Sequence, residues 1–214
     1  MDTEIINNIE EITEPQLYEI LTTILKQFYS NDSILLEKDI HELTISARFM
    51  FYFQNLIPHY NVDIEYNRHI DDIKELLYND STIHKVRPDI IIHKRGNDEH
   101  NLLILELKKE CNTQDNCSST ENMEECKDIN RLKQFTEESK CKKNDNTSYN
   151  YKYGIWLICA KNECLIFLFK KGKLISKKIY NVKKQELSNF NTIPRICKKC
   201  KNKIRCEIIN TLIC

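Results

Sequence analysis

The chain has 214 residues, of which 41% are hydrophobic and 30% are charged, and its formal net charge is zero. This length suits one domain with a sizeable core and argues against two large domains. No apolar run approaches the ~20 residues of a membrane span, and the first residues are acidic where a secretory signal is basic, so we expect a soluble, intracellular protein of the cytoplasm.

Charge is unevenly distributed along the chain. Residues 1–139 contain 14 Lys and Arg against 28 Asp and Glu, whereas residues 140–214 contain 18 against 4. An anionic partner of the C-terminal part would explain this asymmetry. Attraction between the two halves of the chain would explain it equally well.

The first elements in chain order are two helices and three strands. Apolar residues recur at helical spacing over residues 15–29 and again over residues 36–57. The alternation of NVDIEYN predicts a strand over residues 61–67. The apolar runs at 86–93 and 101–109 predict two stronger strands, which the sequence KRGNDEHN joins as a hairpin loop.

The rest of the chain is predicted to add a helix and further strands. Residues 110–125 and 140–149 are polar and are interpreted as loops or insertions, and helical spacing resumes over residues 126–139. Three more strands are predicted, at residues 151–160, 163–170 and 173–180. The order predicts an α/β domain with a mixed central sheet whose middle strands are covered on both faces.

Three charged residues interrupt the two strongest strand candidates. Asp89 lies near the start of one apolar run, and Glu106 and Lys108 lie near the end of the next. Because side chains alternate along a strand, Glu106 and Lys108 share a face that Asp89 can reach from the neighbouring strand. Adjacent carboxylates need a cation to stay ionised, and Mg²⁺ or Mn²⁺ suits oxygen ligands. An E-x-K pattern also fits a surface ion pair, but this run is otherwise almost all Leu and Ile.

The motif Pro88-Asp89 followed by Glu106-Leu107-Lys108 resembles that of the PD-(D/E)xK nuclease superfamily. The resemblance implies the restriction-endonuclease-like fold, with a mixed central sheet flanked by helices. It also implies that Asp89 and Glu106 bind the metal ion and that Lys108 assists the attacking water. The backbone carbonyl of Leu107 is a candidate for a further metal ligand.

A longer pattern is similar to a group of small microbial members of this superfamily. It covers residues 38–158 and includes HELTISARFMFYFQNLIPHYNVDIEYNRH, RPDIIIHKRGNDEHNLLILELKK and DINRLKQFT. The matching positions are Glu42, Arg48, Asp63, Glu65, Tyr66, Asn67, Arg68, Asp89, His93, Arg95, Gly96, Glu106, Lys108, Asp128 and Leu132. This likeness does not supply a substrate.

Further charged residues are candidates for the same site or for nucleic-acid binding. Glu42, in the second helix, is a candidate catalytic or metal-site carboxylate, and a structural cap or a pair with Arg48 fits it equally well. The candidates for nucleic-acid contacts are Arg68, Arg87, Arg95 and Lys133. The arginines can bind phosphate through two nitrogens at once, although salt bridges to the acidic half of the chain also explain them.

The last residues, 191–214, are predicted to form a basic, cysteine-rich metal-binding tail. The chain has ten cysteines, and without a secretory signal a disulfide framework is not expected. Thiolates at x2 spacing can bind one ion, so Zn²⁺ is predicted at Cys197, Cys200, Cys206 and Cys214. Reduced cysteines that bind nothing are the simpler alternative.

An iron-sulfur cluster is the rival to zinc at this tail. The spacing C-x2-C-x5-C resembles the cysteine triplet of RecB-type nucleases that carry a [4Fe-4S] cluster. In those proteins the fourth cysteine lies upstream of the nuclease motif, where this chain has none before Cys111. Cys214 or a cysteine of the polar loop would have to replace it.

The sequence therefore predicts a PD-(D/E)xK nuclease-like domain over residues 1–190, followed by the tail. Its predicted function is Mg²⁺-dependent hydrolysis of phosphodiester bonds, in DNA rather than RNA. The alternative is a nonenzymatic nucleic-acid-binding protein in which the cysteine-rich tail is the functional part and the sheet is a scaffold. A structural subunit of a larger assembly is a third hypothesis. No membrane partner is expected, and a homodimer or larger assembly is left open.

Overall fold

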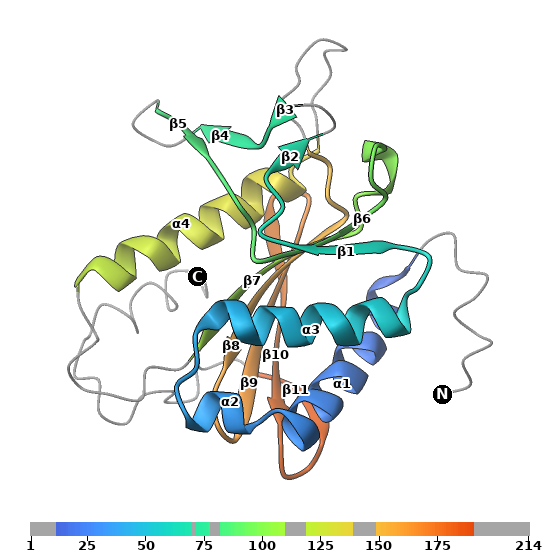
Figure 1. The fold of residues 1–214 in the computed structure, drawn as a ribbon, viewed down its shortest axis with the longest axis vertical. Coiled ribbons are helices and arrows are strands. Elements are labelled where there is room, and N and C mark those ends of the chain that lie inside the picture. Colours follow the sequence, from blue (N-terminus) through green and yellow to red (C-terminus); the bar gives the residue numbers. More distant parts are fainter. Residues whose placement is uncertain (1–11, 70–71, 78–81, 110–118, 139–148, 191–214) are drawn as a thin grey trace.

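A seven-stranded mixed sheet lies at the centre of the computed structural model, which describes residues 12–69, 72–77, 82–109, 119–138 and 149–190 (Figure 1). The strand order is β1-β6-β7-β8-β9-β10-β11. The strands are β1 (Asn61–Ile64), β6 (Ile90–His93), β7 (Leu103–Lys109), β8 (Tyr153–Cys159), β9 (Glu163–Lys170), β10 (Lys173–Asn181) and β11 (Glu186–Asn189). Only β7 and β8 pair in parallel within this sheet, and the other neighbours are antiparallel.

The middle strands of the sheet are buried on both faces. All seven residues of β8 and the first five of β7 are buried. Such strands have a continuous run of apolar residues, because the side chains on both faces pack against helices. A parallel pair also needs a crossover, and the helix α4 (Ser119–Thr136) lies in the connection from β7 to β8.

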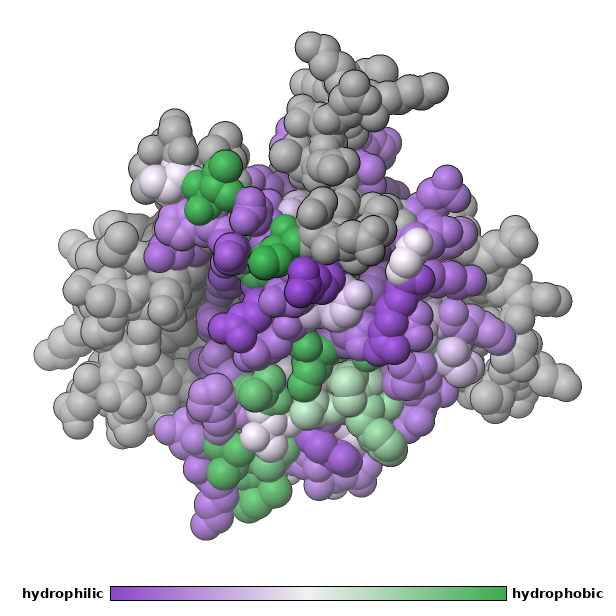
Figure 2. All heavy atoms as spheres, turned by 45° about the horizontal axis from the view of Figure 1, so that its top comes forward, coloured by the Kyte–Doolittle hydropathy of each residue, from purple (hydrophilic) through white to green (hydrophobic). Residues whose placement is uncertain are grey.

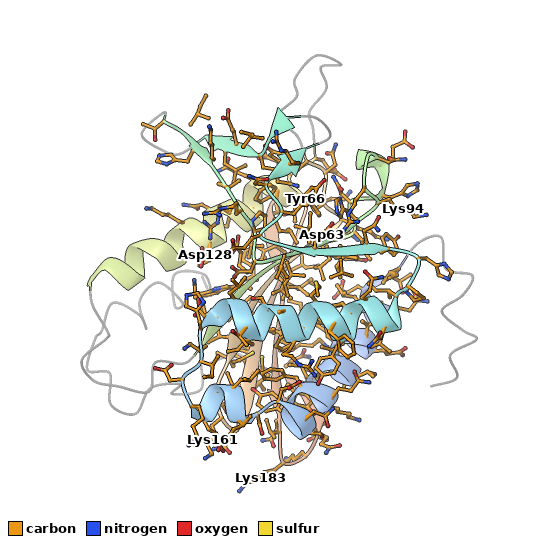
Figure 3. All side chains as sticks on the ribbon, in the orientation of Figure 1. Asp63, Tyr66, Lys94, Asp128, Lys161 and Lys183 are labelled. Carbon is orange, nitrogen blue, oxygen red and sulfur yellow. The ribbon has the colours of Figure 1, made fainter. Side chains whose placement is uncertain are left out.

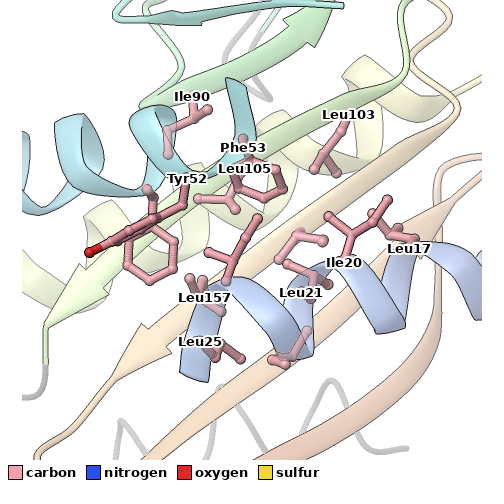
Figure 4. Packing of buried hydrophobic residues seen from close by; sticks show 14 of the residues in the cluster. Leu17, Ile20, Leu21, Leu25, Tyr52, Phe53, Ile90, Leu103, Leu105 and Leu157 are labelled. Carbon is pink, nitrogen blue, oxygen red and sulfur yellow. The ribbon is translucent and has the colours of Figure 1, made fainter. Parts of the chain in front are cut away.

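Two helices near the N-terminus cover one face of the sheet. They are α1 (Glu14–Asn31) and α3 (Glu42–Leu56), with the short α2 (Ile34–Glu37) between them. A capping box of Thr13 and Gln16, with a proline in the first turn, starts α1. Apolar residues of both helices pack on the odd-numbered residues of β7, including Leu103 and Leu105 (Figure 4).

Helix α4 covers the opposite face. Leu132 and Phe135 pack on Ile104 and Trp156 in a second hydrophobic cluster. The helix lies so close to β8 that a Cβ atom at Gly154 would come within 3.0 Å of the Thr136 methyl group. The even-numbered side chains of β7 therefore point toward α4.

A separate set of short strands extends from β1 beyond the edge of the main sheet. The antiparallel pairs are β2 (Arg68–His69) with β3 (Asp72–Ile73), and β4 (Glu75–Leu77) with β5 (Ile83–Lys85). They lie at the top of Figure 1, above α4. Hydrophilic atoms dominate the described surface around them in Figure 2, whereas apolar atoms gather in its lower part.

The mixed α/β architecture confirms the coarse prediction, with corrections to two helices. The helix predicted over residues 36–57 is interrupted, because Asp39 has a φ of 53° and His41 caps the N-terminus of α3. Helix α4 starts at Ser119, inside the predicted loop 110–125, where ENMEE supplies good helix formers. The strands β2 to β5 were not predicted, since two or three residues are too few to show a period.

Several predictions concern segments outside the described residues. These include the cysteine-rich tail with Cys197, Cys200, Cys206 and Cys214, and most of the two polar loops. Within the part of the chain that the structure describes, no helix is both long and apolar enough to cross a membrane.

Candidate active site

The candidate site forms where β6 and β7 stop pairing. The ladder between them ends at Ile90 and Leu105. One residue before β6, the Asp89 carboxylate takes the place of a strand partner, because its Oδ2 accepts the Leu107 N–H at 2.7 Å. Asp89 is therefore held against the edge of β7 by the backbone itself.

Glu42 makes the same kind of contact with β7 two residues further along the strand. Its Oε1 accepts the N–H of Lys109 at 3.0 Å, two residues beyond Leu107. Glu42 lies in the first turn of α3, where the helix dipole favours negative charge. The N–H groups of Leu107 and Lys109, which have no strand partner at this end of β7, thus donate to carboxylates instead.

The side chains of Glu106 and Lys108 point to the other side of this edge and meet α4. Lys108 Nζ lies 3.4 Å from Asp128 Oδ2 and 3.5 Å from Glu42 Oε2. Arg131 Nε lies 3.1 Å from Glu106 Oε1, and its Nη2 donates to Glu106 Oε2 at 3.2 Å. Arg131 also pairs with Asp128, which lies on α4 as well (Figure 3).

These residues form a group, buried at its centre and partly exposed at its rim, that we call the carboxylate cluster. Its members are Glu42, Asp89, Glu106, Lys108, Asp128 and Arg131. With every group ionised, the four carboxylates exceed the two cations by two negative charges. The Glu106 and Asp128 side chains are only 1% and 2% exposed, so water solvates this excess charge poorly.

Hydrogen bonding in the carboxylate cluster is incomplete. Glu106 Oε1 and Asp128 Oδ2 are buried and accept no hydrogen bond, although each lies near a cation. Among the residues that the structure describes, no three His, Cys, Asp or Glu side chains are arranged as a ready metal-binding group. In this conformation the side chains of Arg131 and Lys108 occupy the positions beside the carboxylate oxygens.

Burial and mutual repulsion perturb the acids of the cluster. Burial raises the pKa of Glu106 well above its usual value, and Asp128 and Asp89 raise it further against the opposing charge of Arg131. Burial likewise raises the pKa of Asp89, although the bond from Leu107 opposes the change. A nearby cation would stabilise the ionised form of both acids and lower their pKa values.

The same surroundings stabilise the charged form of Lys108. Burial alone would lower its pKa, but the surrounding carboxylates, led by Asp128 and Glu42, outweigh burial and raise it. Lys108 is therefore a positively charged ammonium at neutral pH. It can donate hydrogen bonds and stabilise negative charge, but it is not a base.

The structure brings together the four side chains predicted from the sequence, Glu42, Asp89, Glu106 and Lys108. The sequence interpretation included Asp128 and the DINRLKQFT stretch in the matched pattern but gave Asp128 and Arg131 no role in the site, and these two residues complete the cluster. Their D-x-x-R spacing on a helix with an apolar face was the available signal, because residues three apart share a helix side.

The predicted nucleic-acid contacts lie apart from this cluster. Lys133 is two residues from Arg131 on α4 and so projects from a different side of the helix. Arg87 pairs with Glu65 at 3.5 Å, and Arg95 forms two bonds to Asp63. The interpretation of the arginines as ion-pair partners thus holds for these two. Arg68 is exposed on β2.

A second polar group lies beside β1. Asp63 accepts from His93 Nε2 at 2.9 Å and from Arg95, and the Tyr66 ring packs on the His93 ring with centroids 5.0 Å apart. Figure 3 places Asp63 and Tyr66 near β1 and β2, away from Asp128. His93 thus has the structural partner that its burial requires.

Comparison of the chain with protein-family models, with curated proteins and with solved structures gave no match.

Proposed function

We propose that the protein is a Mg²⁺-dependent nuclease of the PD-(D/E)xK superfamily, with the restriction-endonuclease-like fold, that hydrolyses phosphodiester bonds in DNA. The observation that carries the proposal is the convergence of Asp89 and Glu106, from neighbouring strands, in a cluster that has two excess negative charges when all its groups are ionised. One divalent cation would neutralise that excess. Lys108 lies beside it, as the motif requires.

The donor atoms fit a hard cation. Carboxylate and carbonyl oxygens are the ligands that Mg²⁺ prefers, and Mg²⁺ retains water at its remaining positions. Glu106 Oε1 is buried without a hydrogen bond and offers a lone pair. Because N–H and C=O of one strand residue project to the same edge, the Leu107 carbonyl faces the edge at which Asp89 accepts the Leu107 N–H.

Each residue of the cluster would then have its own role in hydrolysis. Asp89, Glu106 and the Leu107 carbonyl would hold the ion, which when bound lowers the pKa of water and stabilises charge on the phosphate. Lys108, as a charged ammonium, would orient the attacking water and donate to a phosphate oxygen. Glu42 would position Lys108 through their ion pair.

One observation favours the alternative of a nonenzymatic nucleic-acid-binding protein. Lys108 and Arg131 already pair with three of the four carboxylates, as they would in a purely structural ionic network. A protein with such a network would bind DNA through other surfaces, and the network would need no ion. Only the nuclease would cleave DNA, so a cleavage assay distinguishes the two functions.

The test is cleavage of labelled single- and double-stranded DNA with Mg²⁺ or Mn²⁺. We expect cleavage by the wild type and a loss of about 100-fold or more in Glu106→Gln and Lys108→Ala, because each removes a group that stabilises the transition state. Glu163→Gln, which changes a strand carboxylate outside the cluster, is the matched control. Equal cleavage by all variants, or none by any with DNA binding intact, would remove the catalytic assignment.

We further propose that the tail at residues 191–214 binds Zn²⁺ or a [4Fe-4S] cluster through Cys197, Cys200, Cys206 and Cys214. The support is the cysteine spacing and the lysines among these residues, which lower thiol pKa values. Elemental analysis of anaerobically purified protein, together with its visible absorbance, distinguishes zinc from iron. Absence of both metals would contradict the proposal.

A further inference from the structure

Arg131 makes the most extensive polar contact in the carboxylate cluster. Its guanidinium spans both oxygens of Glu106, with Nε 3.1 Å from Oε1 and Nη2 3.2 Å from Oε2, and it also bonds to Asp128. Arg131 is 20% exposed whereas Glu106 is 1% exposed. The arginine thus reaches inward from the rim and covers a carboxylate that solvent does not reach.

Arg131 and a metal ion would compete for the same oxygens. The proposed function makes Glu106 a metal ligand, and Glu106 has two oxygens, both of which face Arg131. A guanidinium and a divalent cation repel each other, so an ion binds Glu106 less tightly while Arg131 lies against both of its oxygens. Lys108 does not replace Arg131 here, because its ion pairs are with Glu42 and Asp128.

The arginine has a partner that allows it to release Glu106. Asp128 lies one turn before it on α4 and accepts from the same guanidinium. If Arg131 turns away from Glu106, its charge keeps Asp128 as a partner. The structure shows the arrangement in which Arg131 neutralises Glu106, and in an arrangement with a bound cation Asp128 would remain as the partner of Arg131.

We propose that Arg131 is a counter-ion latch, which holds Glu106 when no divalent ion is bound and must release it before an ion can bind. The inference rests on the proposed function, since it takes Glu106 as a metal ligand. The latch stabilises the ion-free protein and lowers its affinity for the ion. The site thereby becomes occupied only when the divalent ion is abundant enough to displace the arginine.

The test measures Mn²⁺ binding to the full chain, after removal of bound metal, through thermal unfolding and calorimetry. Without an ion we expect Arg131→Met to unfold at a lower temperature than the wild type, because Glu106 loses its counter-ion. With Mn²⁺ we expect it to bind the ion about tenfold or more tightly, because a positive charge next to the ion is gone. Its unfolding temperature then rises more on adding Mn²⁺ than that of the wild type does.

Two further variants sharpen the comparison. Arg131→Lys keeps the charge but not the planar fork, so we expect Mn²⁺ affinity between those of the wild type and Arg131→Met. Arg48→Met removes an arginine from an ion pair with Asp32 outside the cluster, and we expect Mn²⁺ affinity as in the wild type. All variants carry the same tail, so Mn²⁺ bound there does not affect the differences.

The results distinguish the latch from the proposed function. Mn²⁺ affinity in Arg131→Met and Arg131→Lys that equals or falls below that of the wild type would overturn the latch while the metal site stood. If Arg131→Met does not fold, Arg131→Lys alone decides. Equal Mn²⁺ binding by the wild type and Glu106→Gln would remove the metal site, and the latch with it.

Discussion

At the scale of single residues, His93 shows how a buried titratable group depends on its partner. Asp63 is acceptor-only when ionised, so His93 Nε2 carries the hydrogen in their 2.9 Å bond. Burial lowers the pKa of His93 below its usual value, although Asp63 opposes the change. Hydrogen bonds from Arg95 and His93 outweigh burial and lower the pKa of Asp63.

These shifts have a defined consequence for stability. Because the pKa of His93 is lower in the folded protein, the unfolded chain binds more protons as the pH falls below about 6.5. The free energy of unfolding should therefore decrease as the pH falls through that value, by about 1.4 kcal/mol for each unit of pKa depression. Urea unfolding of the wild type and His93→Gln between about pH 8 and 5 measures the effect. A pH dependence that is the same in both proteins would contradict it.

The candidate site was partly predictable at this scale. Asp89, Glu106 and Lys108 could be found because charged residues within runs of Leu and Ile conflict with burial unless they have a function. Glu42 was a candidate, but its contacts could not be predicted, because Glu42 is 64 positions before Glu106 in the sequence and meets β7 only after α3 packs on the sheet. Arg131 and Asp128 depend in the same way on how α4 crosses.

At the scale of elements, the position of α4 on β8 sets the geometry of the cluster. Gly154 permits the close approach, since an added Cβ would lie 3.0 Å from Thr136 Cγ2 and 3.4 Å from Leu132 Cδ2. Phe169 Cβ would also lie 3.4 Å away, and because the backbone at Gly154 is outside the left-handed region, an alanine there would meet crowding but no backbone strain. The helix that carries Asp128 and Arg131 thus depends on the absence of one side chain.

We expect Gly154→Ala to lower the free energy of unfolding by about 1–3 kcal/mol, because it overpacks the contact between α4 and β8. Thr136→Ser removes the crowding methyl and keeps the hydroxyl that donates to the Leu132 carbonyl at 2.8 Å. The double variant should therefore lose less free energy of unfolding than the sum of the losses in the two single variants. Denaturant unfolding of the four proteins checks this, and strictly additive effects would count against close packing as the cause.

Elements with a clear period were predictable, and those set by tertiary contacts were not. The predicted strand at residues 163–170 coincides with β9, because an unbroken apolar run next to a turn has few alternatives. The strands β2 to β5 are held by pairing with each other, as in Arg68 with Ile73. The division of the second helix at Asp39 depends on one residue with positive φ, which composition does not reveal.

At the scale of the whole molecule, the charge asymmetry is only partly satisfied within the fold. Among the described residues, ion pairs that join the basic and acidic halves include Lys171 with Glu138 at 2.8 Å and Lys161 with Glu37 at 2.9 Å. Residues 149–190 nevertheless contain nine lysines and only two glutamates. Such an excess of lysine is what an anionic partner would require, so we expect this part of the chain to contribute to DNA binding.

We expect DNA affinity to fall by about tenfold or more between about 50 and about 200 mM salt, because each phosphate contact releases a counterion. Charge reversal at Lys173 and Lys183, which are exposed in the basic half, should weaken both the affinity and its salt dependence. Lys38→Glu, exposed in the acidic half, is the control. Fluorescence anisotropy measures both, and an affinity that does not change with salt would contradict this role.

The most direct measurement of the central claim is anomalous diffraction from crystals of the protein grown with Mn²⁺, because it locates the ion without relying on activity. We expect one anomalous peak within bonding distance of Asp89, Glu106 and the Leu107 carbonyl, with Arg131 turned away from Glu106. A peak elsewhere only, or none at these oxygens with Arg131 still bound to Glu106 at saturating Mn²⁺, would contradict the account.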